Sequence, residues 1–296
     1  MTTIKSMTRT DQAGQLRRLR EQGIASISPR RPRAIAVTGG KGGIGKSAIA
    51  VNLAVSYAGL GARTLLVDGD LGMADLNLLL GVAPERSALD VLQGMPVGEA
   101  LVEVHGLHLL PALNGSFQLE NMDAEARARL LDAIDGLATR FDTLVVDIGA
   151  GIGRNQVEMT GASPTVVVVA TPEPLALADA YACIKVLSRK HQRRRAYILP
   201  NRVRNQDEAD EVVSRLNSLV HRFLDFTLTP LPAIPYDTMV SEAAAEGLPV
   251  VLSRPDSPAS RAIRLAARRL DVLAADEEQP IEGRFFHRRQ ITGDLS

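Results

Sequence analysis

Two lysines stand in one glycine-rich stretch of the sequence. Residues 40–47 read GKGGIGKS and contain Lys41 and Lys46, although arginine far outnumbers lysine in the 296-residue chain. The stretch matches the pattern GxxxxGK[ST], whose glycines let the backbone wrap a chain of phosphates and turn its N–H groups inward. A helix that begins there adds a partial positive charge. In such a loop Lys46 neutralises β- and γ-phosphate oxygens, and the Ser47 hydroxyl binds Mg²⁺.

An ordinary glycine-rich turn is the alternative interpretation of this stretch. The phosphate loop is favoured because every position of the pattern matches, and because an apolar strand precedes the loop and a helix follows it. Lys41 is an additional cation at the start of the loop, where a phosphate cradle alone could use any residue. The residues expected to bind the nucleotide here are Gly40, Lys41, Gly42, Gly43, Ile44, Gly45, Lys46, Ser47 and Ala48.

Carboxylates follow two other apolar stretches. Asp147 ends TLVVD and precedes a glycine-rich turn, so we expect it to support Mg²⁺ from the outer coordination shell. Asp68 and Asp70 end a second stretch, and Asp70 reaches further past it, so we expect Asp70 to position an attacking water. Carboxylates at strand ends also cap helices, and that alternative stays open for Asp68 and Asp75. The expected catalytic residues are Lys41, Lys46, Asp70 and Asp147, and the expected metal site is Ser47, Asp70 and Asp147.

Alternating strands and helices must position these groups. The strands are expected at 33–38, 62–68, 107–110, 143–147, 165–170, 196–200 and just before 234, and the helices at 48–60, 123–139, 174–189, 208–223 and 259–275. Strands that are apolar throughout and alternate with helices indicate a parallel sheet covered on both faces. The expected fold is therefore α/β, the three-layer P-loop NTPase fold, with a mostly parallel central sheet.

Charge and composition divide the chain into three parts. Residues 1–32 form a basic arm, 33–275 one ATPase domain, and 276–296 a flexible tail. No apolar run is long enough to span a membrane, and nothing resembles a secretory signal. Cys183, the single cysteine, is expected as a small core residue, and His105 and His108 are expected in loop and surface positions. We expect a cytoplasmic protein, with peripheral binding at the inner face of the cell membrane as a further option.

The sequence resembles the deviant Walker A ATPases of the MinD/ParA superfamily. The resemblance rests on KGGIGKS with its leading Lys41, on DGDLGMADLNLLLG (68–81) and on FDTLVVDIGAG (141–151). Within the superfamily it is closest to the flagellar-number regulators FlhG and FleN. Supporting segments are TPEPLALADAYACIKVL (171–187), PNRV (200–203), IPYD (234–237) and SPASRAI (257–263). DQAGQLR (11–17) matches the DQAxxLR motif of that subfamily.

This resemblance implies a dimerising molecular switch with ATP and Mg²⁺ as cofactors. Lys41 then reaches the phosphates of the partner subunit in a homodimer, and hydrolysis aided by Asp70 returns the monomer. Asn201 matches the position that reads adenine. The other implied base-contacting residues are Arg202, Pro235 and Asp237.

The resemblance also implies partners. They are a flagellar transcription activator, C-ring components, a membrane surface and the SRP-type GTPase FlhF; direct binding of nucleic acid is not expected. For FlhF the implied activating residues are Asp11, Gln12, Leu16 and Arg17, with the Gln12 amide orienting a water; a plain basic tail is the alternative. Members of the family commonly end in an amphipathic membrane helix, but 276–296 is a poor helix, and 259–275 is expected to pack on the core.

Two other functions stay open. A ParA-like protein would bind DNA non-specifically through the arm and the basic run 189–195, and that binding would fall steeply with salt. An adaptor would bind ATP without turnover, which Asp70 and Asp147 argue against. The leading hypothesis is a slow regulatory ATPase that controls flagellar number or placement and flagellar gene expression.

Overall fold

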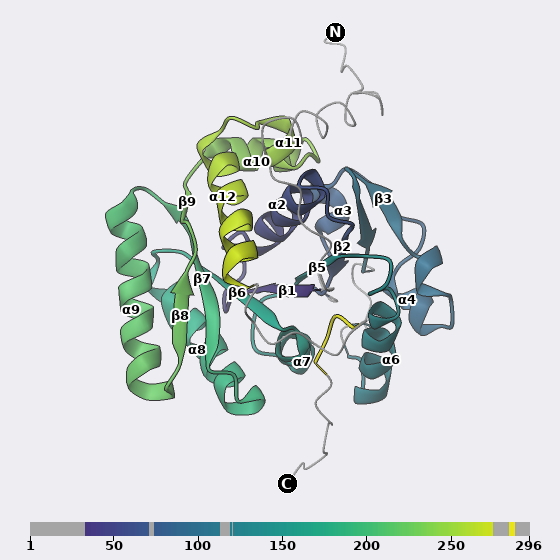
Figure 1. Ribbon diagram of the computed structural model, residues 1–296, viewed down its shortest axis with the longest axis horizontal. Coiled ribbons are helices and arrows are strands. Elements are labelled where there is room, and N and C mark those ends of the chain that lie inside the picture. Colours follow the sequence, from purple (N-terminus) through teal and green to yellow (C-terminus); the bar gives the residue numbers. More distant parts are fainter. Residues whose placement is uncertain (1–32, 71–73, 113–118, 120, 275–283, 288–296) are drawn as a thin grey trace.

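A twisted β-sheet forms the middle of the protein, and helices cover both of its faces (Figure 1). The computed structural model describes residues 33–70, 74–112, 119, 121–274 and 284–287. Within these ranges the strand order is β3-β4-β2-β5-β1-β6-β7-β8, and the short strand β9 pairs with β7. All neighbouring strands are parallel except β3 and β4, which are antiparallel.

The central strands are apolar along their whole length because both faces of the sheet are covered. Every residue of β1, β2, β5 and β6 is buried. Their side chains alternate between two hydrophobic clusters, so that Ala34 and Ala36 face one layer and Ile35 and Val37 face the other. The bounds are β1 Arg33–Thr38, β2 Thr64–Asp68, β3 Val102–Val104, β4 Leu107–Leu110, β5 Thr143–Asp147, β6 Thr165–Ala170, β7 Arg195–Val203, β8 Thr227–Pro230 and β9 Ile234–Pro235.

Two groups of helices make the outer layers. One layer contains α2 (Lys46–Gly59), α3 (Leu76–Leu79), α10 (Thr238–Ala245), α11 (Val250–Ser253) and α12 (Pro258–Leu273). The other contains α4 (Ala88–Leu92), α6 (Ala124–Asp135), α7 (Arg154–Ala162), α8 (Pro174–His191) and α9 (Gln206–Leu224). A short 3₁₀ turn, η1, spans Val97–Glu99. The expected three-layer α/β fold with a mostly parallel sheet is confirmed.

The antiparallel edge strand β3 was not expected from the sequence. A two-residue turn, His105-Gly106, joins it to β4, and both residues have positive φ (48° and 79°), as a tight hairpin turn requires. His105 is buried rather than exposed, and its Nε2 lies 3.1 Å from the Leu80 carbonyl oxygen. The expected surface position of His105 is therefore wrong, because the hairpin folds its ring against the end of α3.

Part of the expected tail belongs to the folded body. Phe285 and Phe286 are 0% and 3% exposed and lie in the same hydrophobic cluster as α6 and α7. Their backbone N–H groups donate to Oδ1 of Asp135 on α6, and the His287 N–H donates to the Ala162 carbonyl at the end of α7. The tail boundary at 276 is thus wrong for these residues, because two adjacent phenylalanines bury more apolar surface against the core than a solvated tail could.

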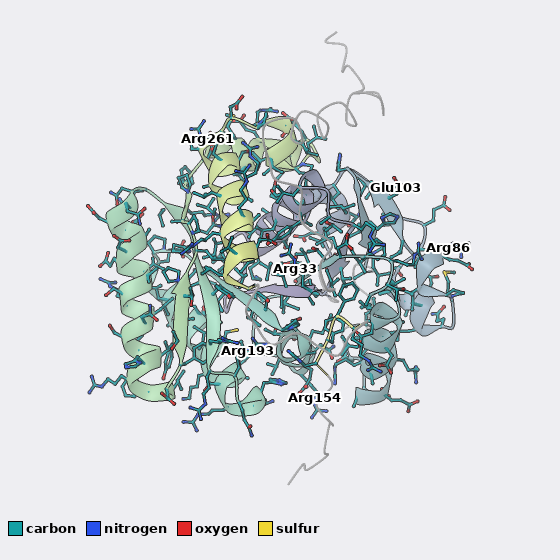
Figure 2. All side chains as sticks on the ribbon, in the orientation of Figure 1. Arg33, Arg86, Glu103, Arg154, Arg193 and Arg261 are labelled. Atoms are coloured by element: carbon teal, nitrogen blue, oxygen red, sulfur yellow. The ribbon has the colours of Figure 1, made fainter. Side chains whose placement is uncertain are left out.

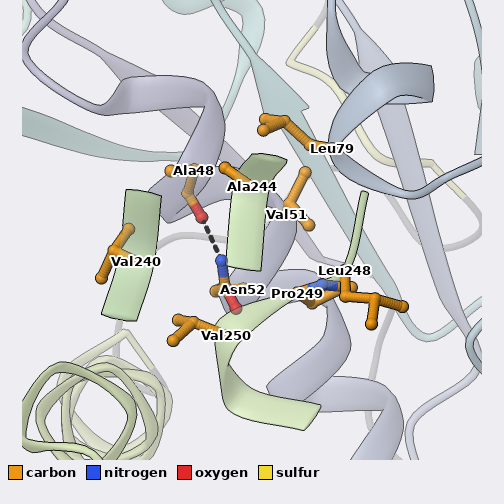
Figure 3. Close-up of a pocket in the computed structure, with 9 residues that line it drawn as sticks. All are labelled: Ala48, Val51, Asn52, Leu79, Val240, Ala244, Leu248, Pro249 and Val250. Atoms are coloured by element: carbon orange, nitrogen blue, oxygen red, sulfur yellow. Dashed lines mark hydrogen bonds between the residues drawn. The ribbon is translucent and has the colours of Figure 1, made fainter. Parts of the chain in front are cut away.

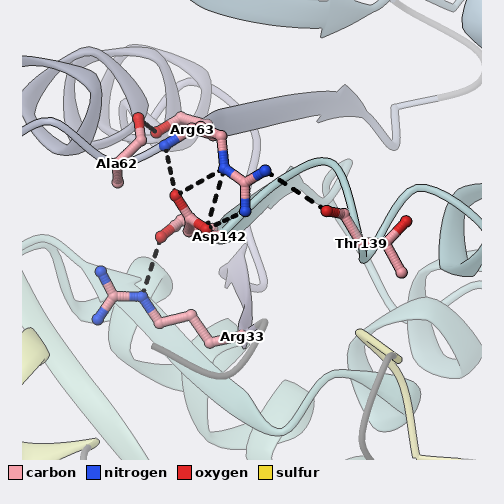
Figure 4. Close-up of polar contacts among 7 residues, drawn as sticks. Arg33, Ala62, Arg63, Thr139 and Asp142 are labelled. Carbon is pink, nitrogen blue, oxygen red and sulfur yellow. Dashed lines mark hydrogen bonds and ion pairs between the residues drawn. The ribbon is translucent and has the colours of Figure 1, made fainter. Parts of the chain in front are cut away.

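Charged residues form an ion pair and hydrogen bonds at the amino ends of the strands. Arg63 pairs with Asp142 through Nη2 at 2.6 Å, and Nε of Arg33 donates to the Thr143 hydroxyl at 3.1 Å (Figure 4). Arg33 lies inside the molecule, whereas Arg86, Glu103 and Arg261 lie on its rim (Figure 2). Among the residues that the structure describes, no helix has both the length and the apolar character needed to cross a membrane.

Candidate nucleotide-binding site

The glycine-rich loop connects β1 to α2 at the carboxyl edge of the sheet. β1 ends at Thr38, and α2 begins at Lys46 with Gly45 as its N-cap. Gly43 and Gly45 have φ of 75° and 93°, a conformation that side chains other than glycine rarely adopt. The first turn of α2 contains no acidic residue, so its N–H groups and helix dipole are not neutralised there. This is the backbone geometry that a phosphate chain requires.

Tight packing fixes the shape of the loop. A Cβ on Gly40 would lie 2.0 Å from the Asp179 carbonyl oxygen of α8, so only glycine fits there. The buried amide of Asn201, on β7, donates from Nδ2 to the Ile44 carbonyl at 2.8 Å. A Cβ on Gly45 would come within 2.6 Å of the same Nδ2. The loop is therefore clamped from α8 on one side and β7 on the other.

The two lysines of the loop have different environments. Lys46 is buried, and its Nζ donates to the Lys41 carbonyl at 3.1 Å. Burial lowers the pKa of Lys46, and the negative charges of Asp147, Asp70 and Asp75 oppose that shift. The Lys41 side chain is 35% exposed and pairs with Oε2 of Glu173 at 2.7 Å. One ammonium group thus faces the inside of the loop, and the other faces outward.

Asp147 and Asp68 end two adjacent parallel strands in register, so their carboxylates meet at the same edge of the sheet. Burial raises the pKa of Asp147 to about 7; Asp75 and Asp70 add to the rise, whereas Ser47 and Lys46 oppose it. Neither Asp147 oxygen has a hydrogen-bond partner among the described residues. Burial, followed by the charge of Asp147, raises the pKa of Asp68 well above its usual value.

Asp70 packs directly against the turn that follows Asp147. A Cβ on Gly149 would lie 2.8 Å from the Asp70 Cγ, so the carboxylate occupies the space that glycine leaves. The Asp70 backbone N–H donates to Oδ1 of Asp68 at 3.1 Å. Asp75 is the N-cap residue of α3 but its side chain does not cap that helix. Burial raises the pKa of Asp75, and the Ser47 hydroxyl opposes the rise, which places Asp75 beside Ser47.

These residues suit Mg²⁺ held between a nucleotide and the protein. No group of three or more His, Cys, Asp or Glu side chains in the described ranges could hold a metal without other ligands. The Ser47 hydroxyl and the phosphate oxygens would supply the inner ligands in a phosphate loop, with water completing them. The buried, unpaired carboxylate of Asp147 next to Ser47 fits an outer-shell partner. The predicted metal residues therefore lie together.

The residues expected to contact the base have other contacts in this structure. Asn201 braces the loop, and the exposed Arg202 follows it with φ of 57°. Pro235, in β9, is half-buried. Asp237 accepts from the Met239 N–H and the Ala259 N–H, both at 3.0 Å, and so caps α10 and α12 together. Glu173 and Asp179 are two further residues around the loop that the sequence did not indicate, because their contacts join segments far apart in the chain.

A small apolar pocket lies beside α2, and neither loop lysine lines it (Figure 3). Its one amide, Asn52, donates to the Ala48 carbonyl at 2.7 Å and accepts from the Val251 N–H at 3.0 Å, so it offers little to a polar ligand. The residues that line it are Ala48, Val51, Asn52, Leu79, Val240, Ala244, Leu248, Pro249 and Val250.

Comparison with known proteins agrees with this geometry. The sequence model of a family described as "ParA: NUBPL iron-transfer P-loop NTPase" matches residues 31–271. The antiactivator FleN of Pseudomonas aeruginosa is 37% identical over 239 residues, which cover 80% of this chain and 85% of FleN. The flagellum site-determining protein YlxH of Helicobacter pylori is 38% identical over 185 residues, 62% of each chain. The crystal structure of the cell division ATPase MinD from Pyrococcus furiosus superposes with a TM-score of 0.67 at 27% identity, covering 82% of this chain and 99% of MinD.

A strand, a GK[ST] loop and a helix, with aspartates from adjacent strands at the same edge, define a P-loop nucleoside triphosphatase. The chain belongs to the ParA/MinD family of these proteins. It is accordingly a P-loop ATPase with ATP and Mg²⁺ as cofactors, as the sequence predicted. The predicted closeness to the FlhG and FleN group is also confirmed by the flagellar relatives.

Proposed function

We propose that this ATPase is a dimerising switch that regulates flagellar number or placement and flagellar gene expression. The observation that carries the proposal is the pair of lysines in the loop. Lys46 is buried toward the chain's own nucleotide site, whereas Lys41 is half-buried and lies on the outer side of the loop, where a second chain can approach. The similarity to FleN and YlxH supports the flagellar process.

The chain's own residues supply each part of ATP hydrolysis. The loop amides and the N-terminus of α2 bind the phosphates, and Lys46 neutralises their β and γ oxygens. Ser47 and Asp147 hold Mg²⁺, which neutralises charge that develops on the phosphates. Asp70 orients the attacking water, and Gly149, in contact with Asp70, leaves the carboxylate its space. Asn201, Arg202, Pro235 and Asp237 flank the adenine in this proposal.

The surface around Lys41 supports a homodimer. Ile152 is 52% exposed and Leu175 is 70% exposed, an unusual exposure for large apolar side chains. A Cβ on Gly42 would lie 3.9 Å from the Ala150 Cβ, so the turn that carries Ile152 borders the loop. Leu175 lies two residues after Glu173, the partner of Lys41. Burying these side chains against a second copy adds hydrophobic stabilisation to the cross-subunit contact of Lys41.

The dimer is tested by exchanging each lysine in turn. Lys46→Ala should weaken ATP binding by about 10- to 100-fold, because it removes a charge-assisted contact to phosphate. Lys41→Ala should bind ATP normally but remain monomeric, and Asp70→Ala should accumulate as a dimer because hydrolysis stalls. Light scattering with ATP measures the mass, and Lys190→Ala, which removes an exposed lysine at the end of α8, is the matched control. If Lys41→Ala dimerises like the wild type, the cross-subunit role is wrong.

The basic arm is proposed to activate the SRP-type GTPase FlhF. Asp11, Gln12, Leu16 and Arg17 lie outside the described residues, so this proposal rests on the DQAxxLR motif alone. The glutamine amide can hold a water with one donor and one acceptor. Full-length protein should stimulate GTP turnover, and Gln12→Ala should bind FlhF without stimulating it. Equal stimulation by both proteins would remove the role of Gln12.

Other partners are a flagellar transcription activator, C-ring components and the inner face of the membrane, where a cytoplasmic protein could bind peripherally. Two arginines of the basic run have partners within the protein, which weighs against the DNA-binding alternative. Arg193 donates to the carbonyls of Ser163 and Pro164, and Arg194 pairs with Asp225, so both guanidinium groups already have protein partners. Retention of the protein on DNA at physiological salt would revive that alternative.

A further inference from the structure

Lys41 already has an ionic partner within its own chain. Its Nζ lies 2.7 Å from Oε2 of Glu173, which is 132 residues further along the sequence. The backbone of Lys41 is fixed because its carbonyl accepts from Lys46. The Lys41 side chain therefore points away from the inside of the loop and toward the start of α8. A contact between residues so far apart requires the complete fold.

The conformation of Glu173 is explained by Lys41 and not by its own helix. Glu173 is the N-cap residue of α8, where an acidic side chain would normally accept from helix N–H groups, but it makes no capping bond. Pro174 at the first helical position lacks an N–H, and the carboxylate turns to the lysine instead. Its bond to Lys41, with the positive charges of Lys41 and Arg202, holds the pKa of Glu173 below its usual value, so the group is ionised at neutral pH.

The pair is located on the surface that the proposed dimer would bury. The Glu173 side chain is 61% exposed, Leu175 is exposed two residues further along, and Ile152 is exposed in the turn that borders the loop. In the proposed dimer the Lys41 ammonium reaches the phosphates of a second chain and shares its charge and donors with them. The contact with Glu173 is therefore weakened or broken when the chain dimerises.

We propose that Glu173 is a positioning residue that holds Lys41 in the monomer and so sets the ATP and protein concentration at which the chain dimerises. The proposal rests on the dimerising function proposed above, with a second copy of this chain as the partner. Exposed ion pairs are weak, so breaking one changes an equilibrium only about 1.4- to 5-fold. A symmetric dimer breaks two, and their product is about 2- to 30-fold. The contact therefore adjusts the threshold without preventing dimerisation.

Glu173→Gln tests the proposal because it keeps the size of the side chain and removes its charge. Dimerisation of the full-length protein is followed by analytical ultracentrifugation over a range of protein concentrations, with ATP and Mg²⁺. We expect the dimer dissociation constant of Glu173→Gln to fall by about 2- to 30-fold. Glu173→Asp, which keeps the charge, should remain closer to the wild type. Glu125→Gln, which removes an exposed carboxylate paired with Arg129 on α6, is the control for net charge.

The possible outcomes separate this inference from the function on which it rests. If wild-type protein does not dimerise with ATP, the proposed function fails. If the wild type dimerises and Glu173→Gln is unchanged or weaker, Glu173 does not restrain Lys41, and a weaker dimer would show that it contacts the partner instead. The double variant Glu173→Gln, Lys41→Ala should stay monomeric, because Glu173→Gln acts only by freeing Lys41. A dimer of this double variant would also overturn the inference.

Discussion

Asp70 depends on the absence of a side chain at residue 149. A Cβ there would lie 2.8 Å from the Asp70 Cγ, a distance that real Cβ atoms essentially never show. We predict that Gly149→Ala displaces the carboxylate and lowers kcat for ATP about 100-fold, because a displacement near 1 Å has that effect on a positioned group. ATP affinity should change little, since the loop and Lys46 are untouched. Steady-state phosphate release over a range of ATP concentrations measures kcat and KM, and ATP binding without turnover checks the affinity.

Gly98→Ala is the control for this substitution. The closest atom to a Cβ at residue 98 is the end of the Arg140 side chain, which can move away. This variant should keep wild-type turnover. If Gly149→Ala were also fully active, the contact with Asp70 would have no part in positioning the water.

Asp237 stabilises two helices with one carboxylate. It accepts from Met239 at the start of α10 and from Ala259 at the start of α12. We predict that Asp237→Ala lowers the free energy of unfolding by about 1–4 kcal/mol, since each lost cap costs about 0.5–2 kcal/mol. Urea unfolding followed by circular dichroism measures the loss. Asp237→Asn keeps one amide oxygen and should lose less than the alanine variant.

The pH dependence of Asp237 has a defined sign. Burial would raise its pKa, but the N–H groups of Ala259 and Met239 outweigh that effect and the pKa is lowered. A depressed folded pKa means that the charge contributes stability above the unfolded pKa, about 3.9, and loses it as the pH falls through the folded value. The stability advantage of wild type over Asp237→Asn should therefore shrink as the pH falls below about 5. A constant difference from pH 7 to pH 3 would contradict the capping by a charged group.

The residues with a local motif could be predicted, and those defined by distant contacts could not. The loop, Asp70 and Asp147 follow from patterns in the sequence at strand ends. Glu173 could not be found, because nothing near it in the chain indicates that it meets Lys41. Asp237 was assigned to the base from resemblance, whereas its two bonds to helix termini depend on how α10 and α12 meet.

Elements were predictable where their apolar pattern was uniform. The buried strands β1, β5 and β6 have the expected bounds, because an uninterrupted apolar run defines where each strand begins and ends. Helix α7 (Arg154–Ala162) was missed, since it is short, follows a glycine-rich turn and has few apolar positions. β3 was missed because it is an edge strand of three residues, none of them fully buried. Neither segment has the length over which periodicity is informative.

The packed segment 284–287 leads to a prediction about Asp135. Its Oδ1 accepts from both Phe285 and Phe286 and so joins this segment to α6. Asp135→Ala should cost about 2–4 kcal/mol, because two buried N–H groups lose their acceptor. Asp135→Asn keeps the acceptor oxygen and should fold at least as stably as the wild type at pH 7. Thermal and urea unfolding compare the three proteins.

The expected stability of Asp135→Asn follows from the direction in which the pKa of Asp135 is shifted. Burial raises the pKa of Asp135 more than its bonds to Phe285 and Phe286 lower it. A carboxyl with a raised folded pKa is least favourable to the fold when ionised, so the wild type gains stability as the pH falls through that pKa. The advantage of Asp135→Asn should be largest at neutral pH and vanish in acid. An asparagine variant as unstable as the alanine variant would show that the charge itself is needed.

At the scale of the whole molecule, the first strand is tied to the last described helix. Arg33, at the start of β1, forms an ion pair with Asp271 of α12, and the two side chains are only 8% and 11% exposed. The Arg33 guanidinium also lies 4.4 Å from the centre of the Tyr57 ring on α2. Helix α12 packs on α2, whose N-terminus forms the phosphate site. One buried pair thus joins the beginning of the domain, its last helix and the helix that binds nucleotide.

Removing one member of this pair should be far more damaging than removing both. Asp271→Ala leaves the Arg33 charge buried, so we expect it to lower the free energy of unfolding by about 3–5 kcal/mol. Arg33→Met with Asp271→Leu replaces both charges by apolar groups and should recover most of that loss. Glu125→Ala, at an exposed pair on α6, should cost less than about 1 kcal/mol and is the control for a surface ion pair. Urea unfolding of Arg33→Met, Asp271→Leu and their combination gives the coupling energy, and ATP binding measured below the transition should be unchanged in each. Additive losses in the double variant would show that the pair is not coupled and that α12 is held by its apolar face alone.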